Sequence, residues 1–173
     1  MRRRGFTIVE LMMAVGILAI LMSIVTVAVS GAMKSARSRR RDAMAAILQE
    51  GLATYYARNG QWPAGMESDA KNGTDQTYEG TQADGIFRKI VQESVGSGKA
   101  PYLDVHALFV APTGTGKKGM GVPFLEARKK NVPHRRQLGI GEMAFGYQDP
   151  STGYFRRFKI KYTAASDSVT VTY

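Results

Sequence analysis

Few side chains in the sequence have the type and spacing that catalysis or metal binding requires. The chain of 173 residues has no cysteine, which excludes thiol nucleophiles, disulfides and cysteine-ligated metal centres. Its two histidines, His106 and His134, leave little for a histidine-rich metal or acid–base site. No nucleophilic triad or carboxylate pair stands out. We therefore do not expect an enzyme.

One stretch, residues 111–118, nearly matches a phosphate-binding P-loop. It reads Ala-Pro-Thr-Gly-Thr-Gly-Lys-Lys, so Lys118 stands where a P-loop needs the hydroxyl that ligates Mg²⁺. The Gly-Met-Gly-Val-Pro that follows is a poor helix start, although a P-loop needs a helix dipole at the phosphates. Nucleotide binding at Lys117 is therefore not expected.

Glu10 is the residue whose position most strongly indicates a specific role. It is the single charge within residues 6–29, FTIVELMMAVGILAILMSIVTVAV. About 24 residues at roughly 1.5 Å each span a bilayer core of about 30 Å. Insertion of the Phe, Ile, Leu and Val side chains gains roughly 4–8 kcal/mol, which exceeds a cost of about 3 kcal/mol for one carboxylate. An intramembrane carboxylate is usually functional. The alternative is a tolerated charge that snorkels to the interface.

A long helix must position Glu10, and its pattern continues beyond the apolar segment. Apolar residues recur at spacings of three and four, which predicts an amphipathic helix, whereas Arg37, Arg41, Gln49 and Arg58 fall on other faces. The apolar positions are Met33, Ala36, Ala43, Met44, Ile47, Leu48, Leu52, Tyr55 and Tyr56. Asn59-Gly60, followed by Pro63, predicts the end of the helix near residue 59.

The remainder of the chain predicts a small sheet with short helices. Residues 60–82 and 112–123 have loop composition, and residues 102–110 are expected to be extended. A short helix that Asp84 begins and Gly96 ends is expected, with one or two helical turns over residues 124–130. Residues 143–148, 154–162 and 169–173 predict an antiparallel meander. Its alternation of Phe158, Ile160 and Tyr162 with Arg157, Lys159 and Lys161 is typical of a sheet with one wet face.

The first residues, Met-Arg-Arg-Arg-Gly-Phe-Thr-Ile-Val-Glu-Leu, resemble the class III signal of type IV pilins and pseudopilins. The resemblance covers about 30 residues. It implies that a prepilin peptidase cleaves between Gly5 and Phe6, that the new amine of Phe6 is methylated, and that Glu10 acts in assembly. In a bundle of axially staggered subunits, the amine of one chain would neutralise Glu10 of its neighbour.

A second stretch, Leu-Ala-Thr-Tyr-Tyr-Ala-Arg-Asn-Gly-Gln-Trp-Pro over residues 52–63, resembles the helix exit of type II secretion major pseudopilins. The resemblance implies an α+β fold in which the long helix packs on a small C-terminal antiparallel sheet, with Tyr55 and Trp62 as core aromatic residues. Those pseudopilins carry an acidic calcium loop, and no convincing counterpart is found in this sequence. Asp149-Pro150, before a glycine and aromatic residues, is only faintly similar to their Asp-Pro-Trp-Gly segment. No cofactor is expected, and calcium rests on the resemblance alone.

Together the resemblances imply a leader at residues 1–5, a transmembrane and filament-core helix at 6–30, and an extracytoplasmic globular domain at 31–173 that includes the second half of the helix. They imply a structural subunit that polymerises into a pseudopilus for protein export. Its expected partners are other copies, minor pseudopilins, an inner-membrane platform protein, prepilin peptidase and membrane lipid. It is expected as a single-pass inner-membrane protein that moves into a periplasmic or extracellular filament.

The net charge of +10 bears on the alternatives. A cationic collar follows the apolar run and could contact lipid headgroups, acidic groups of neighbouring subunits or DNA. The collar consists of Lys34, Arg37, Arg39, Arg40 and Arg41. Counting bases on either side of the span favours the opposite orientation, but the class III signal is the more specific indication. The alternative functions are a type IV or competence pilin for adhesion or DNA uptake, and a secreted domain cleaved after Ser30 by an ordinary Sec signal. Nucleic acid is not an expected partner.

Overall fold

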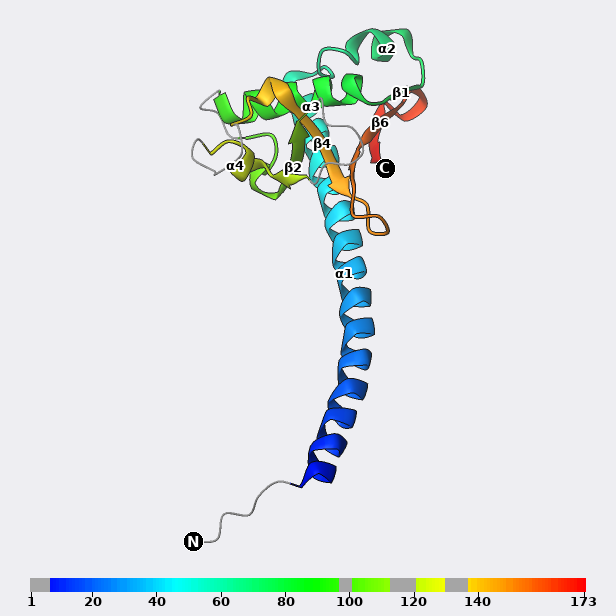
Figure 1. Cartoon of the computed structure of the whole chain (residues 1–173). Coiled ribbons are helices and arrows are strands. Elements are labelled where there is room, and N and C mark those ends of the chain that lie inside the picture. Colours follow the sequence, from blue (N-terminus) through cyan, green and yellow to red (C-terminus); the bar gives the residue numbers. More distant parts are fainter. Residues whose placement is uncertain (1–6, 97–100, 113–120, 130–136) are drawn as a thin grey trace. The chain divides into compact units, whose positions relative to one another are not determined.

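The computed structural model describes residues 7–96, 101–112, 121–129 and 137–173. Its first element is the 52-residue helix α1 (Ile8–Asn59) (Figure 1). Among the described residues, α1 is the one helix long and apolar enough to cross a membrane. It ends where the sequence predicts, because Gly60 takes a left-handed φ of 67° and donates its N–H to the Tyr56 carbonyl at 2.8 Å.

The chain divides into two compact units, one extending to Ala36 and the other running from Arg37 to Tyr173. The first unit is the apolar part of α1, whose large side chains are all exposed. The second unit combines residues 37–59 of α1 with the remaining elements. These are α2 (Glu67–Asn72), β1 (Gln76–Tyr78), α3 (Thr81–Gly96), β2 (Phe109–Pro112), β3 (Val122–Pro123), α4 (Phe124–Ala127), β4 (Met143–Gln148), β5 (Phe155–Arg157), β6 (Lys159–Thr163) and β7 (Ser168–Thr172).

The strands form two antiparallel sheets, ordered β3-β2-β4-β5 and β1-β6-β7. Strand β4 has the predicted bounds, and β7 starts one residue earlier than expected. The predicted strand over 154–162 is instead two strands that separate at Phe158, whose N–H donates to the Phe145 carbonyl at 3.2 Å. A single meander thus becomes two hairpins in different sheets.

One core joins the helices and sheets of the second unit. Leu48 and Leu52 of α1 are fully buried, as are Phe87 of α3 and Phe158 and Ile160 of the sheets. Gly51 permits the close approach of α1 to residue 103, since a Cβ at this glycine would lie 2.7 Å from Leu103 Cδ2. The expected α+β fold, a long helix packed with small antiparallel sheets, is confirmed.

Besides the single strand over 154–162, three expectations about the elements are wrong. The two segments expected as loop are not simply loop, because residues 60–82 contain α2 and β1, a strand that pairs with β6, and residues 112–123 contain the end of β2 and all of β3. The local composition of β1 is polar, so its pairing partner rather than its pattern makes it a strand. Asp84 does not begin α3, which starts at Thr81; it lies within the helix and is buried.

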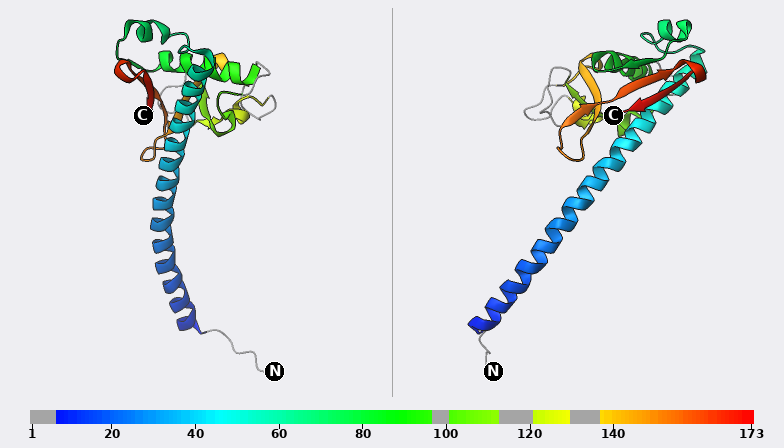
Figure 2. Two further views of the ribbon diagram at one scale, coloured as in Figure 1. Left: turned by 180° about the vertical axis from the view of Figure 1, so that it is seen from behind. Right: turned by 90° about the vertical axis from the view of Figure 1, so that its right-hand side faces the viewer.

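The third error concerns the face of α1 that is buried. Met33, Ala36 and Ala43 were placed on the apolar stripe, but all three are exposed, whereas Ala45 and Gly51 are buried. The views in Figure 2 show α3 and the sheets on one side of residues 37–59, and the other side of this part of α1 uncovered. The uncovered side carries the exposed alanines.

The edge of β7 lies against α1. The Val171 N–H points away from β6 and donates to Gln49 Oε1 at 3.3 Å. Val169 and Val171 turn their side chains into the core, while Lys161 and Thr170 stay on the wet face. The predicted alternation of buried and solvent-facing residues along β6 is confirmed.

Candidate functional site

Glu10 closes the amino end of α1 through a capping box with Thr7. The Thr7 N–H and hydroxyl both donate to Glu10 Oε2 at 2.9 Å, and the Glu10 N–H donates to Thr7 Oγ1 at 3.2 Å. Glu10 Oε1 accepts no hydrogen bond from the described residues. The signal Thr-x-x-Glu is visible in the sequence, but sequence reasoning missed it. The proposed cleavage residues Gly5 and Phe6 lie outside the described residues.

The surroundings of Glu10 are apolar and exposed. Val9, Leu11 and Met13 expose 59–65% of their surface, and Lys34 is the next charged residue along α1. Any assembly that covers this part of α1 would bury the carboxylate among aliphatic side chains. The free oxygen of Glu10 would then need a donor from another molecule, because a buried charge without a partner is strongly destabilising.

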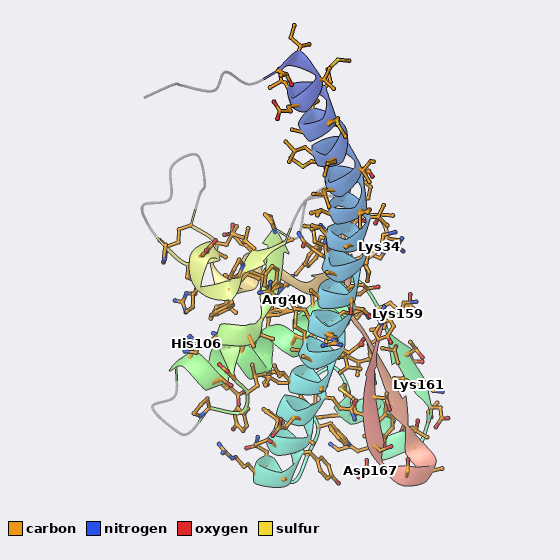
Figure 3. All side chains as sticks on the ribbon, turned by 90° about the horizontal axis from the view of Figure 1, so that it is seen from below. Lys34, Arg40, His106, Lys159, Lys161 and Asp167 are labelled. Atoms are coloured by element: carbon orange, nitrogen blue, oxygen red, sulfur yellow. The ribbon has the colours of Figure 1, made fainter. Side chains whose placement is uncertain are left out.

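The collar is held in part by aromatic residues of the globular unit. The Arg40 guanidinium lies 3.7 Å from the centre of the Phe109 ring (Figure 3). Arg41 lies 3.8 Å from the Tyr173 ring centre, donates to the Tyr173 hydroxyl at 3.2 Å and pairs with Asp42 at 2.9 Å. Cation–π contacts of this kind stabilise by about 0.5–1 kcal/mol at exposed sites. Sequence reasoning missed Phe109 and Tyr173, which have no local signal.

The helix exit is fixed by one carboxylate. Tyr56 and Trp62 stack with ring centres 4.4 Å apart, and Asp167, in the turn between β6 and β7, receives three donors (Figure 3). These are the Tyr56 hydroxyl at 2.6 Å, Trp62 Nε1 at 2.8 Å and the Tyr162 hydroxyl at 3.0 Å. The Tyr56 and Trp62 hydrogen bonds lower the pKa of the Asp167 carboxyl. Tyr55 and Trp62 are buried core residues, whereas the role of Asp167 was not predicted.

Asp149 organises the turn over residues 149–154. Its Oδ1 accepts the N–H and hydroxyl of Ser151 at 2.8 and 2.5 Å and the Thr152 N–H at 3.2 Å, and its Oδ2 pairs with Arg156 at 2.5 Å. The Ser151 hydrogen bonds lower the pKa of Asp149 to about 2. Across the described ranges, no three His, Asp or Glu side chains gather as a metal site. Asp149 therefore serves the turn by itself, and calcium still rests on the resemblance.

The other sequence candidates contribute little to a described site. Only Ala111 and Pro112 of the P-loop-like stretch are described, and both belong to β2; Lys117 and Lys118 lie outside the described residues, as does His134. His106 is exposed on a short 3-10 turn after Asp104.

Residues 1–26 match the family model of the prokaryotic N-terminal methylation motif. No curated protein and no solved structure matches the chain. With α1 behind it, the motif indicates a membrane-anchored protein of the type IV pilin-like class. The same motif implies processing by prepilin peptidase and assembly into filaments in general.

Proposed function

We propose that the protein is a pseudopilin, a structural subunit of a type II secretion-type pseudopilus that drives protein export. The observation that carries the proposal is the carboxylate of Glu10, which is the single charge in the apolar segment at the start of α1 and lies within the methylation motif of residues 1–26. The resemblance of residues 52–63 to the helix exit of major pseudopilins supports this subclass over a fibre-forming pilin. No catalytic role is proposed for any residue.

The subunit acts by polymerising. Cleavage after Gly5 removes three arginines and creates a positive amine on Phe6, four residues before Glu10. In a bundle of parallel helices, this amine pairs with Glu10 of a neighbour and fixes the axial register. The capping box holds Oε2 within its own chain and leaves Oε1 for the neighbour's amine.

The partners follow from this mechanism. The membrane stores the subunit as a single-pass protein, prepilin peptidase processes it, and a platform protein and minor pseudopilins start the filament. The globular unit remains outside the cytoplasm and then lies on the outside of the filament. The contacts of Arg40 and Arg41 with Phe109 and Tyr173 favour a structural role for part of the collar over DNA binding.

The test compares Glu10→Ala, Glu10→Gln and Gly5→Asp in cells. Sheared fractions are immunoblotted, and intact masses of the membrane pool identify the N-terminus. We expect both Glu10 variants to insert and to be processed at Phe6, because the leader is unchanged and a costly group has left the apolar span. Filament yield should fall sharply in both, whereas Gly5→Asp should leave unprocessed chains in the membrane.

Glu10→Gln is the matched control, because the amide oxygen keeps the capping box but has no charge. Normal filament yield from Glu10→Gln would show that Glu10 acts by capping its own helix, and the pairing mechanism would be wrong. Mature chains that begin at Gly31 would instead indicate a Sec-cleaved secreted domain and overturn the assignment.

A further inference from the structure

The uncovered side of α1 outside the apolar segment has a regular composition. Residues spaced alternately by four and three lie on one face of a helix, and here all eight are exposed. They are Ala32, Ala36, Arg39, Ala43, Ala46, Glu50, Ala53 and Ala57. The opposite side of α1, with Leu48 and Leu52, is buried in the core. We call residues 39, 43, 46, 50, 53 and 57 the outer face of α1.

The two charged members of the outer face are opposite in sign and have no partner in the described part of the chain. Neither Arg39 nor Glu50 forms an ion pair or hydrogen bond there, although the next two collar residues, Arg40 and Arg41, contact aromatic rings. Eleven residues separate Arg39 from Glu50, which is about 16 Å along the axis and about 20° around it. The two charges are therefore collinear along the helix, too far apart to meet within one chain.

We infer that the outer face of α1 binds the outer face of α1 in a second copy of this chain. The second copy is displaced along the helix axis by about 16 Å, so that Arg39 of one copy pairs with Glu50 of the other. This inference rests on the proposed function and names a surface by which subunits join outside the membrane. The copy that binds the outer face is a different neighbour from the one whose Glu10 pairs with the Phe6 amine, because four residues correspond to a displacement of only about 6 Å. The same displacement brings Ala46 of one copy next to Ala57 of the other. Alanine at these positions lets the helix backbones approach closely.

A second copy is the partner that the features of α1 favour. The outer face continues without a break from the exposed apolar segment, since α1 is one helix from Ile8 to Asn59. Copies inserted in one membrane through that segment point the same way, so their α1 helices are parallel. Charge complementarity then requires an axial displacement, because without one Arg39 would face Arg39 and Glu50 would face Glu50.

Charge reversal in the full-length protein tests the pairing. Arg39→Glu or Glu50→Arg alone creates like-charge contacts between copies, and we expect sheared-filament yield to fall by about tenfold or more. The combined variant Arg39→Glu/Glu50→Arg restores opposite charges and should recover most of the yield. Lys161→Glu, which reverses an exposed charge on the wet face of β6, is the matched control and should leave the yield unchanged.

Cysteine cross-linking tests the displacement independently, because the chain has no native cysteine. Ala46→Cys/Ala57→Cys, eleven residues apart, should give a ladder of disulfide-linked multimers on mild oxidation of membranes or filaments. Ala32→Cys/Ala57→Cys, twenty-five residues apart along the same exposed positions, is the control and should give no ladder, because the proposed displacement leaves the two cysteines about 20 Å apart along the axis. Disulfides form only when Cα atoms approach to about 4.4–6.8 Å, so the readout reports the register.

The outcomes separate this inference from the proposed function. Wild-type filaments with normal yield from both single charge reversals, or a ladder from the control pair but not from the test pair, would overturn the outer-face contact and leave the pseudopilin proposal standing. If Lys161→Glu lowered the filament yield as much as the single charge reversals did, the loss would be due to the change in net charge, and the outer-face contact would be wrong. Wild-type cells that make no filaments would overturn the proposed function itself.

Discussion

The buried Asp84 offers a test of how the β3-β2-β4-β5 sheet is tied to α3. Its side chain is 1% exposed, Oδ1 accepts the buried Phe145 N–H at 3.0 Å, and Oδ2 lies 3.3 Å from Arg157 Nε. Asp84→Ala leaves the Phe145 N–H of β4 without an acceptor, which costs about 1–3 kcal/mol. Loss of the partly exposed Arg157 pair adds up to about 1 kcal/mol. We expect the free energy of unfolding to fall by about 1–4 kcal/mol.

Asp84→Asn separates the hydrogen bond from the charge. The amide keeps an acceptor for Phe145, and burial raises the pKa of Asp84, which means that the protein interior disfavours the carboxylate. The Asn variant should therefore lose less than about 1 kcal/mol at pH 7. The pKa of the Asp84 carboxyl is higher in the folded protein than its unfolded value of about 3.9. The protonated Asp84 carboxyl therefore contributes stability that is fully present below about pH 3.9 and is lost as pH rises through the folded pKa. The free energy of unfolding of Asp84→Asn should therefore rise relative to that of the wild type as pH increases over the same range.

The assay is urea unfolding of residues 31–173 at pH values from 4 to 8, followed by tryptophan fluorescence. With a slope of about 2 kcal/mol per molar urea, the Ala variant should lower the midpoint by about 0.5–2 M. If Asn and Ala destabilise equally at pH 7, then the Arg157 ion pair rather than the Phe145 hydrogen bond holds β4 to α3, and the reasoning above is wrong.

Four further predictions complete the set, three on the second unit and one on nucleotide binding. The fragment 31–173 should melt cooperatively, because residues 37–173 form their own core, and calorimetry checks this. It should be a monomer, because contact between the alanines of two outer faces would bury little apolar area, and sedimentation checks this. Leu48→Asp or Tyr55→Asp should unfold it, since each places an unpaired charge in that core, and loss of the circular dichroism melt is the readout. Asp149→Asn should lower the melting temperature near pH 6, and the difference should disappear as pH falls toward about 2, because a lowered folded pKa gives stability that is lost on protonation. Calorimetric titration with ATP should show no binding that Lys117→Ala removes, and micromolar affinity would revive a nucleotide-dependent role.

The helices and strands of the fold were predictable where the local sequence signals were strong. Proline-free periodicity and the Asn59-Gly60 stop predicted α1, and the alternation around Ile160 predicted which side chains of β6 are buried, although not the bounds of that strand. Strand β1 was missed because three polar residues become a strand only by pairing with β6. Ala36 and Ala43 were misplaced because alanine fits either side of an amphipathic helix, and only tertiary packing decides which side is buried.

The candidate site divides in the same way. Glu10 was identifiable as one charge in an apolar span, and Trp62 as a core aromatic residue after a helix end. The acceptors and rings that complete the sites come from distant segments: Asp167 meets Tyr56 across 111 residues, and Tyr173 meets Arg41 across 132. No local sequence pattern around Asp167 or Tyr173 indicates which distant residue each contacts, so these contacts could be identified only from the three-dimensional structure.

The contact of Gln49 with Val171 affects how copies of the protein can associate while they lie together in a membrane. Pilin-like subunits wait side by side in a membrane, where crowding favours any irreversible association. Strand β7 is the longest edge strand among the described ones, and an open edge would recruit the same strand from a neighbour into a continuous sheet. The Gln49 side chain occupies the Val171 N–H, which an added strand would need, so α1 blocks extension of the sheet at this position. Contacts through the exposed side of α1 remain possible without sheet-to-sheet association.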